Sequence, residues 1–261
     1  MFKFKFRQSN FGGIFMIRYK CVVSYDGYDY FGYQKQNHHP LTIQETIQSA
    51  FKKMFNEEYI IYASGRTDAK VHAYGQVFHV DLNIKINNDA LKKGLNSFLP
   101  HDIRIIKVNK VASNFHARYD VKQKVYEYHL LNKKELNPFE SRYNGLVKEK
   151  IDLDILKDAT KILIGTHNFK NFTTNKETEV ESFVKTIYDI KVKKSGNMIK
   201  LEFYGSGFLR YMVRLLVGGL IVVATRKKNI SYLQDLINLN SLEKCSYKAN
   251  PEGLYLKKVI Y

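Results

Sequence analysis

Short strand patterns alternate with amphipathic helix patterns along this chain, and their order restricts the folds that it can adopt. In residues 17–25 apolar and polar side chains alternate, which predicts a half-buried strand. Thr42 and Glu45 form a capping box before apolar residues at helical spacing, which predicts a helix. The segments that follow are a strand at 59–63, a strand at 78–82, a helix at 89–97 and a strand at 103–108. This order of strands and helices is that of ferredoxin-like domains.

A second set of similar segments fills the rest of the chain. Its members are a strand around 126–130, a helix at 152–163, strands at 188–192 and 199–203, a long helix from Gly207, a shorter helix near 231–238 and a strand at 254–259. No low-complexity linker separates the two sets, which favours one compact body. We therefore predict an α+β fold in which two ferredoxin-like α/β halves, residues 16–112 and 113–261, share a mostly antiparallel sheet with a cleft between them.

The fold is expected to begin at Met16. Residues 1–15 alternate Phe with basic residues and lack a continuous apolar segment, so they do not have the pattern of a secretory signal. We interpret them as an N-terminal extension and expect translation to start at Met16, which opens the first predicted strand.

Residues 208–224 form the most apolar run of the sequence. Arg210 and Arg214 interrupt this run, and it is shorter than a comfortable membrane span. It is therefore predicted to be a buried helix, and no membrane contact is expected. Gly218 and Gly219 lower its helix propensity, which indicates close packing against another segment.

The balance of charge indicates a polyanionic partner. Lys plus Arg number 42 and Asp plus Glu 25, which gives a net charge of +17 that is spread along the chain. A folded and strongly basic protein most often binds nucleic acid. A charge that serves solubility, or a lysine-rich genome, would give the same composition.

The cysteine content excludes two classes of metalloprotein. Cys21 and Cys245 are the only cysteines, and they form no Cys-x-x-Cys pair. This ligand count excludes a zinc ribbon and a zinc deaminase, and no metal site is predicted. The low cysteine content fits a reduced, cytoplasmic setting.

One acid in an otherwise cationic segment is a candidate functional group. Residues 64–76, SGRTDAKVHAYGQ, place Asp68 among polar and basic side chains and between two glycines. Asp and Gly are favoured in turns for backbone reasons, so an ordinary surface turn also explains the pattern. Taken by itself, the segment leaves both interpretations open.

Six motifs in the same order carry a resemblance to a known enzyme family. They are SYDGYDYFGYQKQ (24–36), GRTDAKVHAYGQVFHV (65–80), LPHDIRI (99–105), FHARYDVKQKVYEYHL (115–130), GTHNFKNF (165–172) and GFLRYMVRLLVGGL (207–220). Together they resemble the TruA-type tRNA pseudouridine synthases over nearly the whole chain after Met16. The resemblance implies a pseudouridine synthase fold with a central catalytic cleft. It also implies a homodimeric isomerase that acts without a cofactor on uridines of the tRNA anticodon stem-loop, at positions 38, 39 or 40.

The resemblance further implies roles for four residues. It places the family's catalytic aspartate on Asp68, and on Arg214 the arginine that keeps this acid ionised. It places on Tyr126 the tyrosine against which a flipped uracil stacks. Arg66 matches an arginine that fills the space of the flipped base or holds its phosphate. Asp68 and Arg214 come from opposite halves, and we expect their side chains to meet at hydrogen-bond distance.

Each role has a structural alternative. Arg214 could extend from a buried helix to solvent, Tyr126 could be an ordinary core residue, and Arg66 could simply face solvent. The reaction breaks the C1′–N1 bond and rejoins the base through C5. A carboxylate either adds to the base or sugar or helps to remove a C2′ proton, and the sequence leaves both routes open.

Three residues depart from the usual pattern of the family. Lys70 replaces a glycine, Tyr33 a tryptophan and Lys185 an arginine. Lys70 lies in the tight turn beside Asp68, so this turn must tolerate a side chain. These departures leave open a diverged enzyme with a different tRNA target. A non-catalytic RNA-binding protein on the same scaffold is the main alternative, and a metal-dependent nuclease, which needs several clustered carboxylates, is a weaker one.

Overall fold

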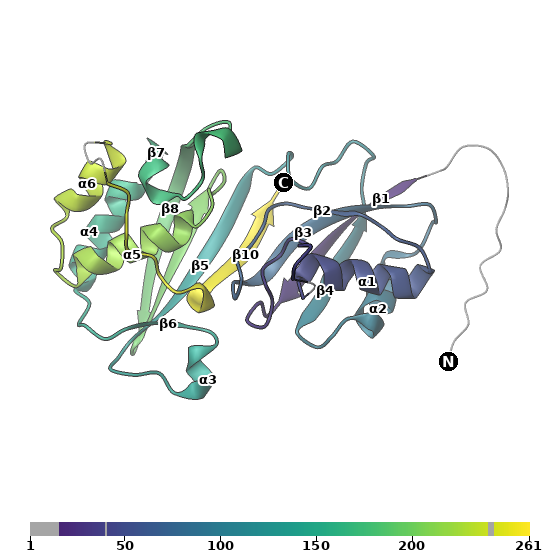
Figure 1. Ribbon diagram of the computed structural model, residues 1–261, viewed down its shortest axis with the longest axis horizontal. Helices are drawn as coiled ribbons and strands as arrows, with labels where there is room; N and C mark the ends of the chain where they lie inside the picture. Colours follow the sequence, from purple (N-terminus) through teal and green to yellow (C-terminus); the bar gives the residue numbers. More distant parts are fainter. Residues whose placement is uncertain (1–15, 40, 240–242) are drawn as a thin grey trace.

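The computed structural model describes residues 16–39, 41–239 and 243–261. This part of the chain forms one sheet of ten strands, and Figure 1 shows α1 and α2 packed at one end of it and α4, α5 and α6 at the other. The arrangement confirms the predicted α+β class. The proposed extension, residues 1–15, lies outside the described residues.

The N-terminal half has the ferredoxin-like connectivity that its sequence predicts. Its elements are β1 (Ile17–Tyr25), α1 (Ile43–Phe55), β2 (Ile61–Ala63), β3 (His72–Leu82), α2 (Asn88–Phe98) and β4 (Ile103–Lys110). The strand order is β4-β1-β3-β2, and each neighbouring pair is antiparallel. Burial alternates residue by residue along β1, because only one face of this strand packs into the core.

The C-terminal half repeats this connectivity with additions. Its elements are β5 (Gln123–Asn132), α3 (Pro138–Ser141), β6 (Gly145–Val147), α4 (Leu153–Leu163), β7 (Gly165–Asn168), β8 (Val184–Ser195), β9 (Met198–Gly205), α5 (Met212–Ala224), α6 (Ser231–Ile237) and β10 (Leu254–Ile260). The order β10-β5-β9-β8 is antiparallel throughout, and β7 extends it at the outer edge. The short elements α3, β6 and β7 were not predicted.

The last strand joins the two halves into one sheet. β10 returns to the middle of the molecule and pairs in parallel with β3, with Tyr255 opposite His72 and Leu256 opposite Ala73 (Figure 1). The loop that links β2 to β3 ends at this pairing. A side chain on that loop is therefore placed at the junction, within reach of both halves.

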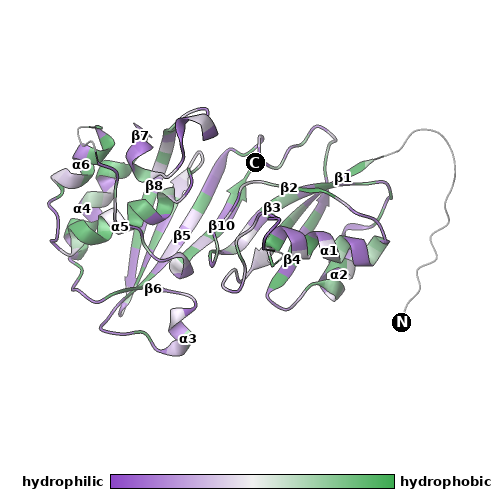
Figure 2. Ribbon diagram, viewed as in Figure 1, coloured by the Kyte–Doolittle hydropathy of each residue, from purple (hydrophilic) through white to green (hydrophobic). Residues whose placement is uncertain are grey.

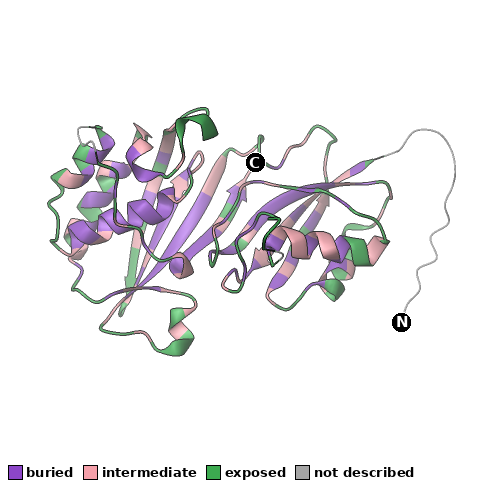
Figure 3. Cartoon of the chain, viewed as in Figure 1, coloured by how far each residue is buried: buried purple, intermediate pink, exposed green. Residues whose placement is uncertain are grey.

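The apolar run of the sequence forms the buried helix α5. Figure 2 shows it as mainly hydrophobic, and Figure 3 shows it as buried along most of its length. It begins at Met212 and not at Gly207 as predicted, because Tyr211 has a left-handed backbone conformation with φ of 60°. Within the described residues no helix has the length and apolarity needed to span a membrane.

Candidate active site

Hydrogen bonds hold the loop that carries Asp68, between β2 and β3. The Thr67 carbonyl accepts from the backbone N–H of Tyr33 at 3.0 Å, and the Thr67 and Tyr25 hydroxyls are 2.8 Å apart. The backbone N–H of Val71 donates to the Asp68 carbonyl at 3.2 Å. Because both sides of the loop are fixed in this way, the fold determines the direction in which Asp68 points.

Lys70 adopts a backbone conformation that usually belongs to glycine. Its φ is 66°, in the left-handed region, where a side chain costs about 1–2 kcal/mol. Its Nζ lies 3.3 Å from Glu252 Oε1 and 4.9 Å from the centre of the Tyr28 ring. The turn beside Asp68 therefore accommodates a side chain, as the sequence required, and these contacts tie it to the segment before β10.

Arg214, near the beginning of α5, lies against Asp68. Its Nη1 is 3.4 Å from Asp68 Oδ2, and its Nε donates to the Ala249 carbonyl at 2.8 Å. The Arg214 side chain is 9% exposed and that of Asp68 is 26% exposed. The guanidinium is thus directed inward at the acid and does not extend to solvent.

Burial and nearby cations shift the pKa of Asp68 in opposite directions. Burial raises the pKa of the Asp68 carboxyl, while Arg214 and, more weakly, Arg210 and Lys248 lower it. The net pKa lies above the ordinary value for an aspartate. Arg214 therefore offsets only part of the effect of burial on the pKa of Asp68, because the two groups are 3.4 Å apart and the loss of water is the larger effect.

The Tyr211 ring makes cation–π contacts with three basic residues near Asp68. The centre of its ring lies 4.6 Å from Lys248 Nζ, 5.2 Å from Arg210 Cζ and 5.3 Å from Arg214 Cζ. A cation over an aromatic face is stabilised by the charge distribution of the ring. The ring therefore helps three like charges to lie close to a single acid, Asp68.

Tyr126 projects from β5 into the same region. It is buried, and the Phe208 ring meets it edge to face with centroids 5.2 Å apart. Burial, followed by the electrostatic influence of Tyr25 and Asp68, raises the pKa of Tyr126 well above its usual range. The phenol therefore stays protonated at neutral pH, and the group offers an aromatic face and a hydroxyl.

Arg66 lies on the exposed side of the loop. Partial loss of water around its guanidinium, followed by repulsion from Arg118 and Arg210, lowers the pKa of Arg66. Arg118 is exposed as well. Arg66 thus belongs to a cationic surface next to Asp68, and it makes no contact with the acid that compares with that of Arg214.

Comparison with known proteins places the chain in a family. The family model described as tRNA pseudouridine synthase matches residues 21–120 and 159–261. The chain belongs to the tRNA pseudouridine synthase family. It is 41% identical to a protein of Oceanobacillus iheyensis named tRNA pseudouridine synthase A, over 94% of this chain and 97% of the relative. Proteins named tRNA pseudouridine synthase A from Onion yellows phytoplasma and tRNA pseudouridine synthase A 2 from Clostridium perfringens are 39% and 41% identical, each over 93% of this chain and 98% of the relative.

The structure brings three of the four predicted residues together. Asp68 and Arg214 are in contact, Tyr126 is close enough to Asp68 for the charge to affect its pKa, and Arg66 stands at the edge. Ala249, which holds Arg214 through its backbone carbonyl, was not among the predicted site residues. A backbone carbonyl can accept from any residue type, so the sequence carries no signal for this contact. Phe208, which contacts Tyr126, was not predicted either, although it lies inside the motif at 207–220.

The described residues contain no group of three His, Cys, Asp or Glu side chains that could hold a metal ion.

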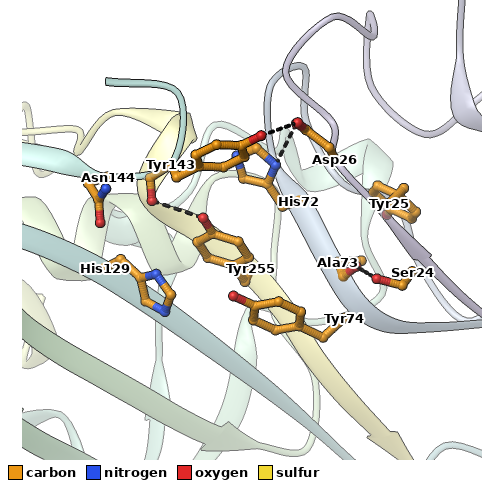
Figure 4. Close-up of a pocket in the computed structure, with 10 residues that line it drawn as sticks. All are labelled: Ser24, Tyr25, Asp26, His72, Ala73, Tyr74, His129, Tyr143, Asn144 and Tyr255. Carbon is orange, nitrogen blue, oxygen red and sulfur yellow. Dashed lines mark hydrogen bonds and ion pairs between the residues drawn. The ribbon is translucent and has the colours of Figure 1, made fainter. Parts of the chain in front are cut away.

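A cavity of about 380 Å³ lies apart from the Asp68 site, between β1, β3, β5, β10 and the segment that follows α3 (Figure 4). Its lining residues include none of the four predicted site residues. Among these lining residues, the Tyr143 hydroxyl donates to Asp26 Oδ2 at 2.9 Å, and His72 Nδ1 lies 3.0 Å from Asp26 Oδ1.

Proposed function

We propose that this chain isomerises uridine to pseudouridine in the anticodon stem-loop of tRNA, at one or more of positions 38, 39 and 40, and that Asp68 is its catalytic carboxylate. The observation that carries the proposal is the pairing of Asp68 with the buried Arg214 across the two halves of the sheet. A carboxylate held among cations serves catalysis, whereas RNA binding alone does not need an acid there. Membership of the family supports the same reaction.

The reaction requires only that bonds be exchanged within one nucleotide. The C1′–N1 bond breaks, a C1′–C5 bond forms, C5 loses a proton and N1 carries one in the product. An ionised Asp68 either adds covalently to the nucleotide or takes up the C2′ proton, and it is released unchanged at the end of either route. Arg214 favours the ionised form of Asp68 in both routes.

We assign the binding of the flipped uracil to Tyr126 and Arg66. The buried and protonated Tyr126 provides a flat aromatic face at the side of Asp68. Arg66, on the exposed side of the loop, replaces the extruded base or holds its phosphate.

The halves at 16–112 and 113–261 each contribute residues to the site. The enzyme acts in the cytoplasm as a homodimer. Light scattering of the purified protein tests the dimer.

Mapping of pseudouridine in cellular tRNA tests the proposed function. Cells that lack this chain should lose pseudouridine at positions 38, 39 or 40, and the wild-type gene should restore it. Restoration by Asp68→Asn would favour a non-catalytic RNA-binding protein. Loss of pseudouridine at other tRNA positions only would identify a diverged enzyme with a different target.

A further inference from the structure

Lys124 lies beside the catalytic loop and takes no part in the roles assigned above. It precedes Tyr126 by two residues on β5, so both side chains leave the same face of the strand. Its Nζ donates to the carbonyl of Ser64 at 2.7 Å, at the beginning of the loop that carries Asp68. The ammonium group is thus fixed at one side of the site.

No carboxylate in the described part of the chain pairs with this ammonium group. The charged groups that act on it are Arg118, from the segment between β4 and β5, and Lys185, from β8. Burial and repulsion from these two cations lower the pKa of Lys124 to about 8. A partly buried cation without a counterion is costly, and an anion from outside would reduce that cost.

Gly65 provides the space into which the ammonium group fits. A Cβ at this position would lie 2.7 Å from Lys124 Nζ, closer than a side chain can normally approach. Arg66, the next residue along the loop, is exposed and is also influenced by Arg118. The loop therefore has one cation that is partly buried, Lys124, and one that is exposed, Arg66.

We propose that Lys124 binds a backbone phosphate of the RNA substrate beside the catalytic loop. The inference rests on the proposed function in that the anion is taken to be part of an RNA. Among the described residues no carboxylate competes for the Lys124 ammonium group, and the bond from Lys124 to Ser64 couples the position of the phosphate to the loop. Binding of the RNA thereby stabilises the loop in the position seen here.

The salt dependence of tRNA binding tests this site without reference to activity. Each phosphate contact contributes about 0.7–0.9 to the slope of log affinity against log salt concentration. Lys124→Met should reduce the steepness by about that amount relative to the wild type. Lys124→Gln should give the same reduction while it keeps a donor for the Ser64 carbonyl, so a defect in loop structure cannot explain the result.

Two matched variants complete the experiment. Lys228→Met removes one exposed lysine beyond the far end of α5, and its slope should equal that of the wild type. Gly65→Ala displaces the ammonium group from the Ser64 carbonyl but keeps its charge. This variant should keep the wild-type slope while its single-turnover rate at saturating tRNA falls.

Slopes for Lys124→Met and Lys124→Gln that match the slope for Lys228→Met would overturn the proposal. The slopes measure tRNA binding alone, so this test can fail or succeed separately from the proposed enzymatic function. A wild-type protein that binds tRNA but forms no pseudouridine would contradict the function, and the slopes would still report whether Lys124 meets a phosphate.

Discussion

At the scale of single residues, Asp68 is held in an environment that both opposes and supports its charge. Burial raises its pKa, and the contact with Arg214 offsets part of that rise. Because the ionised form is the one that reacts, the rate should fall as the pH is lowered through this raised pKa. The balance between the two effects therefore sets the acid limit of the activity.

Removal of the arginine should shift that limit. In Arg214→Met the pKa of Asp68 rises further, so the acid limb of the single-turnover rate at saturating tRNA should move to higher pH, and part of the rate should return as the pH is increased. Arg210→Met is the matched control, because Arg210 acts on Asp68 more weakly, and its shift should be smaller. Equal pH profiles for Arg214→Met and the wild type would show that Arg214 does not act through the charge of Asp68.

Two tyrosines next to the loop should respond in opposite ways to the loss of their hydroxyls. The hydroxyl of Tyr33 is buried and has no hydrogen-bond partner among the described residues. Tyr33→Phe should raise the free energy of unfolding by about 1 kcal/mol or more, since an unsatisfied buried hydroxyl carries a cost of that size. Tyr25→Phe, which loses the contact with Thr67, should lower it by about 0.5–1.5 kcal/mol.

Urea unfolding of both tyrosine variants measures the difference. A Tyr33→Phe protein that is less stable than the wild type would indicate that the hydroxyl finds a partner, such as ordered water.

At the scale of elements, α5 is important because it holds Arg214 and the segment that anchors it. The Gly218 backbone lies so close to Tyr247 that a Cβ at this position would overlap the Tyr247 carbonyl. The segment after Tyr247 carries Lys248 and Ala249, and the Ala249 carbonyl accepts from Arg214. Close packing at the helix glycines, which the sequence indicated, is thus confirmed, and it positions the site.

The two glycines of α5 should differ in their tolerance of a methyl group. Gly218→Ala has to displace backbone and should cost about 1–3 kcal/mol or more. Gly219→Ala meets the end of the Leu233 side chain at 2.9 Å, which can rotate away, so its cost should be smaller. Thermal unfolding of the two variants would contradict this packing if Gly219→Ala were the less stable.

Elements with strong periodicity were predictable from the sequence, and local irregularities were not. The strand at 17–25 and the helix that begins after Thr42 were predicted because burial follows their period. Tyr188 and Ile190 are two residues apart, so a regular strand would place them on the same face. In β8 a bulge between Ile187 and Asp189 breaks this alternation, and Tyr188 is 50% exposed whereas Ile190 is buried. The start of α5 was misplaced because a left-handed tyrosine, Tyr211, leaves no signal in the sequence.

At the scale of the whole molecule, the pairing of β10 with β3 decides where the site lies. It brings the loop before β3 next to α5, and so it places Asp68 against Arg214 although they are 146 residues apart in sequence. Periodicity predicted strands at 78–82 and 254–259, but not that β3 and β10 pair and so join the two halves. The residues of the site came from the resemblance to the family, because spacing alone does not bring together residues so far apart.

The net charge of +17 should make tRNA binding strongly dependent on salt. A protein that contacts six to ten phosphates loses about 10³–10⁵ in affinity between 50 and 200 mM salt. Filter binding or anisotropy over that range measures the effect. An affinity that stays constant would contradict a binding surface built from these cations.

The most direct test of the account is the activity of Asp68→Asn. This variant keeps the size of the side chain and removes the charge, so the fold and tRNA affinity should remain close to those of the wild type. Release of tritium from tRNA labelled at uridine C5 follows the reaction, because C5 loses its hydrogen when pseudouridine forms. The wild type should release tritium, and Asp68→Asn should be slower by at least about 10⁴-fold, as is typical when a catalytic nucleophile is removed. Release by a folded, tRNA-binding Asp68→Asn protein at a rate near that of the wild type would show that Asp68 is not the catalytic carboxylate.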